Sequence, residues 1–305
     1  MAIPDLDLNK LLARDVHEMA RLRQGVRSVG FLTLSHTSLT ASRVRRVIAA
    51  YRQFFRLPEA RKRAVDMART GANRGWGAAG SEQVNPDANP DFKQVFDCGY
   101  ELPPGHPMAA RGLSVYAPNL WPADPPGFRA EIEAYYADAL DVGRQVLSAI
   151  AAAIGRDADS FATAFDPPMA LLRGNYYPAR PDGAGERDFG IAAHTDYGCL
   201  TLLAMDGTPG LSVQMPDGAW REINAPPGSF VINFGEMLEM WTSGQVKATL
   251  HRVVGGGTER ISVPLFLNPA YDTNVAPPGS DRMIVAGDHL TRRFGETYLH
   301  LKPAD

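Results

Sequence analysis

The chain has 305 residues, a hydrophobic fraction of 45% and a formal net charge of -3 at pH 7. This composition is ample for a sizeable core, and the mild acidity gives no electrostatic footprint for nucleic acid. Neither a secretory leader nor an apolar run of the roughly 18 residues that a membrane span requires is recognisable. Two cysteines are too few for a disulfide framework. We therefore expect a cytoplasmic protein without nucleic-acid or membrane partners.

The first 125 residues predict a helical region with long loops. Apolar positions recur at helical spacing over 9–27 and 38–57, and an apolar run at 29–34 predicts a buried strand between them. Residues 70–125 are rich in Gly, Pro, Asn and Asp, with short strand-like pieces such as 92–96. Loops of this kind often carry substrate contacts on a rigid scaffold.

Residues 126–305 predict a β-rich core that follows a long helix at 127–154, and we expect the two regions to form one compact unit. After residue 168, short apolar runs alternate with Gly, Pro and Asp, which indicates an antiparallel sandwich or barrel. The expected strands are 170–177, 190–194, 200–205, 211–215, 220–223, 230–234, 247–254 and 261–267.

Two histidines and one aspartate form a candidate catalytic metal site. His194 and Asp196 are two residues apart, so their side chains leave the same face of an extended segment. Such a pair often occurs by chance, but His251 follows in a third apolar run. Two neutral imidazoles and one carboxylate leave one face of a metal open, which suits a non-haem Fe(II) centre that holds a co-substrate and O2 together.

Arg260 and Ser262 share one face of the strand that follows His251. A guanidinium fork and a hydroxyl are the groups that a diacid co-substrate needs for its carboxylate remote from the metal. The glycines at 255–257 predict a hairpin between the two strands. Depending on the turn, His251 lies opposite Ser262 or opposite Arg260.

The strand before the first ligand carries three polar residues on one face, namely Arg173, Asn175 and Tyr177. If that face points inward, the Tyr177 hydroxyl can join Arg260 and Ser262 around one carboxylate. An inward Arg173 must meet either a protein carboxylate or an anionic group of the substrate, because an unpaired buried guanidinium is costly.

With these residues, the chain resembles the isopenicillin N synthase-like Fe(II)/2-oxoglutarate-dependent dioxygenases. The resemblance implies a double-stranded β-helix (jelly-roll) core, iron bound by His194, Asp196 and His251, and 2-oxoglutarate bound by Arg260 and Ser262. Tyr177, with Asn175 nearby, matches the family's tyrosine near the same co-substrate. The matching segments are 30–36, 54–58, Asn175–Pro178, His194–Gly198, Pro227–Leu238, His251–Arg252 and Arg260–Ser262.

The resemblance implies an oxygenase that hydroxylates, desaturates or cyclises a small molecule, with release of succinate and CO2. We expect a substrate that is amino-acid-derived or a secondary metabolite, with Arg173, Tyr197 and Phe266 as candidate contacts. A same-family oxidase that does not use 2-oxoglutarate, and a 2-oxoglutarate fragmentation that forms ethylene, stay open. A zinc hydrolase is more remote because it would leave Arg260 and Ser262 unexplained.

Overall fold

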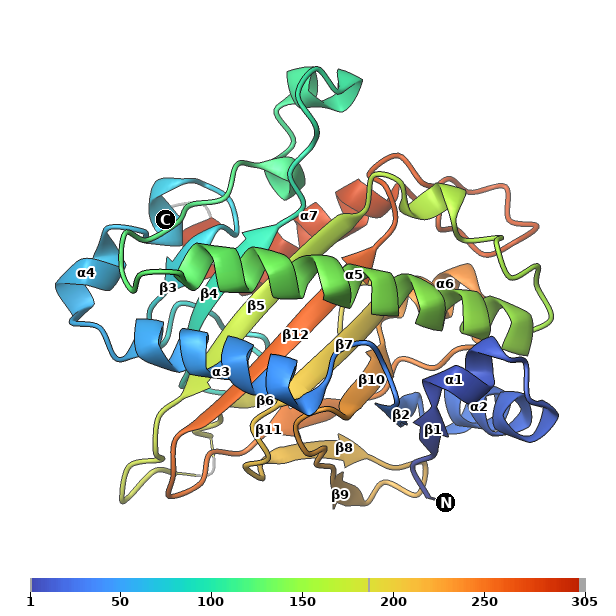
Figure 1. Ribbon diagram of the computed structural model, residues 1–305, viewed down its shortest axis with the longest axis horizontal. Helices are drawn as coiled ribbons and strands as arrows, with labels where there is room; N and C mark the ends of the chain where they lie inside the picture. Colours follow the sequence, from blue (N-terminus) through green and yellow to red (C-terminus); the bar gives the residue numbers. More distant parts are fainter. Residues whose placement is uncertain (1, 186, 302–305) are drawn as a thin grey trace.

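Two facing β-sheets form the centre of the computed structural model, which describes residues 2–185 and 187–301. Figure 1 shows the larger sheet running diagonally behind two long helices, with the smaller sheet below it. The larger sheet has the order β1 (Asp5–Asp7), β2 (Phe31–Ser35), β10 (Phe230–Phe234), β7 (Leu200–Met205), β12 (Arg260–Asn268), β5 (Met169–Tyr177), β4 (Gln94–Gly99) and β3 (Gly75–Gly77). The smaller sheet has the order β6 (Ile191–His194), β11 (His251–Val253), β8 (Leu211–Gln214) and β9 (Trp220–Glu222).

Each face of the larger sheet buries a separate apolar cluster. Between the sheets lie side chains such as Phe31, Leu203 and Val213, and the outer face packs against helices through residues such as Leu202 and Leu265. Because side chains alternate along a strand, one strand supplies both clusters. This two-sheet architecture with helices on one side confirms the expected double-stranded β-helix.

Seven α-helices are present in the described part of the chain, and the longest of them, α5, packs beside α3 on the outer face of the larger sheet (Figure 1). In α5 the side chains of Ile132, Val142 and Ile150 are fully buried, as expected for an apolar face at helical spacing. Within the described residues, no helix has the length and apolarity to cross a membrane. The helices are α1 (Leu8–Leu12), α2 (Val16–Ser28), α3 (Ala41–Phe55), α4 (Glu59–Arg63), α5 (Phe128–Ala153), α6 (Glu236–Trp241) and α7 (Ala286–Thr297), with 3-10 turns η1 (Met67–Arg69), η2 (Pro107–Arg111), η3 (Ser114–Tyr116), η4 (Thr163–Phe165) and η5 (Leu299–Leu301).

The first 125 residues contribute more β-structure than their pattern predicts. The expected helix at 9–27 is two helices, because Arg14 adopts a φ of 57° and the Asp15 side chain accepts from the amide of Glu18 to begin α2. Four strands, β1 to β4, join the larger sheet at its two ends. The pairing of β2 with β10 and of β4 with β5 makes the sheet continuous across both regions.

The expected hairpin between His251 and Arg260 is wrong. Strand β11 pairs with β6 and β8 in the smaller sheet, whereas β12 pairs with β5 and β7 in the larger one. The glycines at 255–257 therefore carry the chain from one sheet to the other. His251 lies opposite His194, and Arg260 lies opposite Tyr177.

Candidate metal and carboxylate site

The structure brings His194, Asp196 and His251 together at the end of the smaller sheet. The pairing of β11 with β6 sets the two imidazoles side by side, with ring centroids 4.3 Å apart. Asp196 Oδ1 lies 3.8 Å from His194 Nε2 and 3.5 Å from His251 Nε2. One ligand atom from each residue lies within 4.8 Å of the other two, so the three can hold one metal ion.

Backbone carbonyls fix how the two imidazoles present their nitrogens. His194 Nδ1 lies 2.8 Å from the carbonyl of Ala192, and His251 Nδ1 lies 3.0 Å from the carbonyl of Thr249. A carbonyl oxygen can only accept, so each Nδ1 carries the proton and each Nε2 offers its lone pair to the centre. This arrangement is typical of histidines that bind metals.

Two polar residues from the larger sheet hold the aspartate, and the sequence pattern did not single out either of them. Asp196 Oδ2 accepts from Asn233 Nδ2 at 2.6 Å and from the hydroxyl of Thr201. These bonds occupy Oδ2 and leave Oδ1 facing the histidines. Asn233 and Thr201 are buried within apolar strands, where a polar side chain requires a partner. That requirement was the available signal in the sequence.

Two of the three ligands, His194 and Asp196, also favour the protonation states that bind a metal. Burial, reinforced by the neighbouring His251 ring, lowers the pKa of His194 to about 3, so this ring is neutral at pH 7. Burial alone would raise the pKa of Asp196, but the facing imidazoles and the bond from Thr201 outweigh it and hold this pKa below its ordinary value. Burial opposes a charge on His251, yet the Asp196 carboxylate raises its pKa. A metal cation would reverse that last effect.

Arg260 is buried with most of its guanidinium unused. Nε donates to the carbonyl of Thr208 at 3.2 Å, while Nη1 and Nη2 have no hydrogen-bond partner among the described residues. The group stacks over the Tyr177 ring, 5.0 Å from its centroid. Buried donors without partners are rare and costly, so the pair of nitrogens is a ready site for a carboxylate.

The remaining expected co-substrate residues lie beside this arginine. Ser262 pairs with Asn175 across β12 and β5, and Asn175 Nδ2 donates to Ser262 Oγ at 3.5 Å. Asn175 Oδ1 has no hydrogen-bond partner in the described ranges. Gly190 makes room for this arrangement, because a Cβ there would lie 2.7 Å from the Tyr177 ring and 3.2 Å from Val253.

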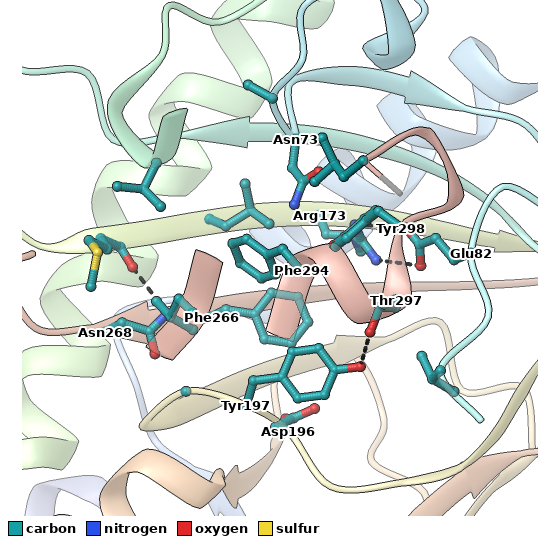
Figure 2. Close-up of a pocket in the computed structure, with 18 of the residues that line it drawn as sticks. Asn73, Glu82, Arg173, Asp196, Tyr197, Phe266, Asn268, Phe294, Thr297 and Tyr298 are labelled. Carbon is teal, nitrogen blue, oxygen red and sulfur yellow. Dashed lines mark hydrogen bonds and ion pairs between the residues drawn. The ribbon is translucent and has the colours of Figure 1, made fainter. Parts of the chain in front are cut away.

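A pocket extends from the metal ligands toward the loops of the first region and helix α7 (Figure 2). Its cavity measures about 130 Å³, which is room for on the order of ten water-sized groups. Tyr197 and Phe266, two expected substrate contacts, both line it, and Phe294 of α7 adds a third ring. The other apolar residues of its wall include Val84, Val115, Met169, Leu171, Leu290 and Leu301.

Arg173 lines the same pocket but is paired within the protein. Its Nε and Nη2 donate to both oxygens of Asp97 at 2.7 and 2.6 Å, and Nη1 donates to Glu82 Oε2 at 3.0 Å. Nη2 also donates to the Tyr298 hydroxyl at 2.6 Å. The sequence left open whether Arg173 meets a protein carboxylate or a substrate anion, and it meets protein carboxylates. This internal ion pair favours the first of the two alternatives, a protein carboxylate as the partner of Arg173.

The ion pair of Arg173 belongs to a larger buried set. Lys93 Nζ lies 2.7 Å from Asp91 Oδ2 and 2.8 Å from Glu82 Oε2. We call the five residues Asp91, Lys93, Glu82, Arg173 and Asp97 the buried ion network. Each of its side chains is at least nine-tenths buried.

Comparison with known proteins places these features in a family context. Residues 3–124 match the model described as non-haem dioxygenase in morphine synthesis N-terminal, and residues 168–269 match the 2OG-Fe(II) oxygenase superfamily. A 2-oxoglutarate-Fe(II) type oxidoreductase of Aspergillus fumigatus is 32% identical over 88% of this chain and 83% of its own length. The 2-oxoglutarate-dependent dioxygenase traH of Penicillium crustosum is 34% identical over 97% and 93%.

Solved structures agree with the sequence relatives. A full-length Neurospora crassa protein in complex with alpha-KG superposes with a TM-score of 0.85, at 28% identity, over 96% of both chains. The same protein has also been solved with alpha-KG and thymine, with a TM-score of 0.84.

Proposed function

Because the chain belongs to the 2OG-Fe(II) oxygenase superfamily, we propose that it hydroxylates a small molecule at the metal triad with 2-oxoglutarate as co-substrate. The enzyme is a dioxygenase that uses Fe(II), 2-oxoglutarate and O2. In the proposed assignment His194, Asp196 and His251 bind the iron. Arg260 and Ser262 bind the remote carboxylate of 2-oxoglutarate, with Tyr177 and Asn175 beside them.

The observation that carries this assignment is the Arg260 guanidinium, buried with two nitrogens that have no hydrogen-bond partner among the described residues. A planar fork with two free donors fits a carboxylate in two parallel bonds. The Tyr177 ring, stacked on the guanidinium, limits how the fork can turn. The donor set therefore suits the co-substrate whose name recurs among the relatives.

When bound, Fe(II) with 2-oxoglutarate supplies the activation of O2, coupled to decarboxylation of 2-oxoglutarate to succinate. The protein's own share is positioning. Asn233 and Thr201 orient the Asp196 carboxylate, and the Ala192 and Thr249 carbonyls orient the imidazoles. The apolar wall around Phe266 excludes water from the reacting C–H bond and holds that bond near the ligands.

Relatives differ in what they act on, so the substrate belongs to the proposal. The Neurospora crassa relative has been solved with thymine, JOX2 with 2OG, Fe and JA, and a relative of Oryza sativa is named homoarginine-6-hydroxylase. The pocket of this chain has the size for a compact molecule. Desaturation or ring closure would use the same residues, because both also begin with removal of hydrogen from a C–H bond.

The test is anaerobic reconstitution with Fe(II), followed by calorimetric titration with 2-oxoglutarate and an O2-dependent succinate assay. Thymine, jasmonate and homoarginine serve as the first substrate panel, and headspace gas is analysed for ethylene. We expect one equivalent of iron, one of 2-oxoglutarate, and succinate formation that a substrate accelerates. O2 consumption without 2-oxoglutarate binding would instead establish the 2-oxoglutarate-independent oxidase. Ethylene as the main product would establish fragmentation, and hydrolysis with zinc alone would establish the hydrolase.

A further inference from the structure

We propose that the substrate is an uncharged molecule and that Asn73 binds a hydrogen-bond acceptor at its end remote from the metal ligands. The proposal rests on the proposed function, because it takes the cavity beside His194 and Asp196 as the substrate pocket. It names a substrate class and a specificity-determining residue for that pocket.

The charged groups of the pocket compensate one another. The buried ion network holds three carboxylates and two cations, and Arg74, which also lines the pocket, acts on the Asp97 carboxylate as a third cation. These three negative and three positive formal charges sum to zero, and the Asp196 carboxylate is assigned to the metal ion. The guanidinium of Arg74 is already engaged, because it donates to the backbone carbonyls of Asn73, Val115 and Ala117 at 2.8, 2.7 and 3.2 Å.

An ion that entered this pocket would find no free counter-charge. Arg173 already makes four hydrogen bonds to Asp97, Glu82 and Tyr298. A substrate carboxylate would have to displace one of those partners and leave it buried and unpaired, which costs more than the new pair contributes. The same argument excludes a substrate ammonium, because Glu82 already faces Lys93 and Arg173.

Asn73 is a buried polar side chain of the pocket without a side-chain hydrogen bond among the described residues. It is 5% exposed, and its Oδ1 is buried without a hydrogen-bond partner among the residues that the structure describes. Its amide nitrogen donates to none of those residues. Figure 2 shows its amide nitrogen pointing into the pocket, toward the space between Phe294 and Arg173. A ligand acceptor such as a carbonyl oxygen or ring nitrogen would give this amide nitrogen the hydrogen-bond partner that the described residues do not supply.

The position of Asn73 also orients the substrate. In Figure 2, Asn73 lies at one end of the pocket and Asp196 at the other, with the rings of Phe266 and Tyr197 along the path between them. A molecule held at its far edge by Asn73 and along its faces by aromatic rings would present its opposite end to the metal ligands. One amide and several rings thus give both orientation and selection for an uncharged ligand.

The test measures binding to the Fe(II)- and 2-oxoglutarate-loaded protein under anaerobic conditions by calorimetry. The probes are two pairs, uracil with orotate and benzamide with benzoate, in which the second member carries a carboxylate. We expect each neutral member to bind at least about tenfold more tightly than its anionic partner, a difference of about 1.4 kcal/mol.

Variants at Asn73 separate its hydrogen bond from its volume. Asn73→Asp keeps the shape but loses the donor, and Asn73→Ala loses both. Each should weaken the neutral probes about three- to tenfold, the range of one net hydrogen bond. Ser160→Ala, at an exposed position outside the pocket lining, is the control and should leave the affinities unchanged.

Three results would overturn the proposal. They are equal or tighter binding of the anionic members, unchanged affinity in Asn73→Asp, and no binding of either neutral probe while 2-oxoglutarate binds normally. Failure of 2-oxoglutarate itself to bind is measured in the same titration series. It would overturn the proposed function instead, so the two failures are distinguishable.

Discussion

At the residue scale, the two unused nitrogens of Arg260 make a sharp prediction about co-substrate affinity. Arg260→Ala should weaken 2-oxoglutarate binding by at least about a hundredfold, since two charge-assisted bonds contribute roughly 1.5–3 kcal/mol each. Arg260→Lys should recover only part of this loss, because an ammonium cannot form the fork. Iron affinity should stay unchanged in both variants.

Anaerobic calorimetry with iron-loaded protein measures these affinities. Arg252→Ala is the matched control, because Arg252 follows His251 directly but stacks on Trp220, 4.1 Å from its ring centroid. Equal 2-oxoglutarate affinity in wild type and Arg260→Ala would remove Arg260 from the co-substrate site.

A second residue-scale prediction concerns the side chains behind Asp196. Asn233→Leu should lower Fe(II) affinity about ten- to a hundredfold, because the carboxylate loses the bond that orients it. Thr201→Val should act in the same direction. Metal competition titrations measure the loss of affinity. Wild-type Fe(II) affinity in both variants would show that Asp196 binds the metal without these two hydrogen bonds.

At the element scale, the buried ion network ties a loop to two strands. Glu82 lies in a loop, Asp97 in β4 and Arg173 in β5, so the network fastens the first region to the sheet. Burial alone would raise the pKa of Glu82, but Arg173 and Lys93 outweigh it and lower this pKa to about 2. The ionised carboxyl is thus favoured in the folded protein.

The lowered pKa of Glu82 determines how the stability of the folded protein changes with pH. A depressed folded pKa stabilises the protein above the unfolded value of about 4.3, and the contribution is lost as pH falls toward the folded value. Glu82→Gln should therefore lower the unfolding free energy by about 3 kcal/mol at pH 7. The difference from wild type should shrink at pH 3.5. Guanidinium titrations at both pH values check this, and a constant difference would contradict it.

The bounds of the strands were easier to predict from the sequence than the pairing of one strand with another. Apolar runs gave β7 and β10 at their observed bounds, because alternation and length are local properties. The hairpin at 255–257 was wrong, because pairing depends on which sheet closes over the core and not on the turn alone. The three-residue β1 and helices α6 and α7 were not predicted, since short or mixed patterns carry little local signal.

The site shows the same division. The sequence pattern could predict that the triad residues lie together, and it singled out Arg260 and Ser262, because each set combines rare residue types at a fixed spacing. The co-substrate role of Arg260 and Ser262 stays a prediction. The partners of Arg173 could not be predicted, because Asp97 and Glu82 are 76 and 91 residues away in the sequence. Asp97 meets Arg173 through the pairing of β4 with β5, and Glu82 reaches it from a loop. Asn73 also lies in a loop whose path the sequence pattern does not specify.

At the scale of the whole molecule, the shared sheet predicts that neither region folds without the other. A fragment of residues 126–305 would leave β10 without β2 and β5 without β4, which exposes two apolar strand edges. We expect this fragment to aggregate and the full chain to unfold in a single calorimetric transition. A soluble fragment with native-like far-UV circular dichroism would contradict the prediction.

The placement of helix α7 has a consequence for how the enzyme is made. During synthesis, His194, Asp196 and His251 leave the ribosome before α7, whose Leu290 and Phe294 complete the pocket wall. A growing chain can therefore assemble its metal ligands while the cavity beside them is still open to solvent.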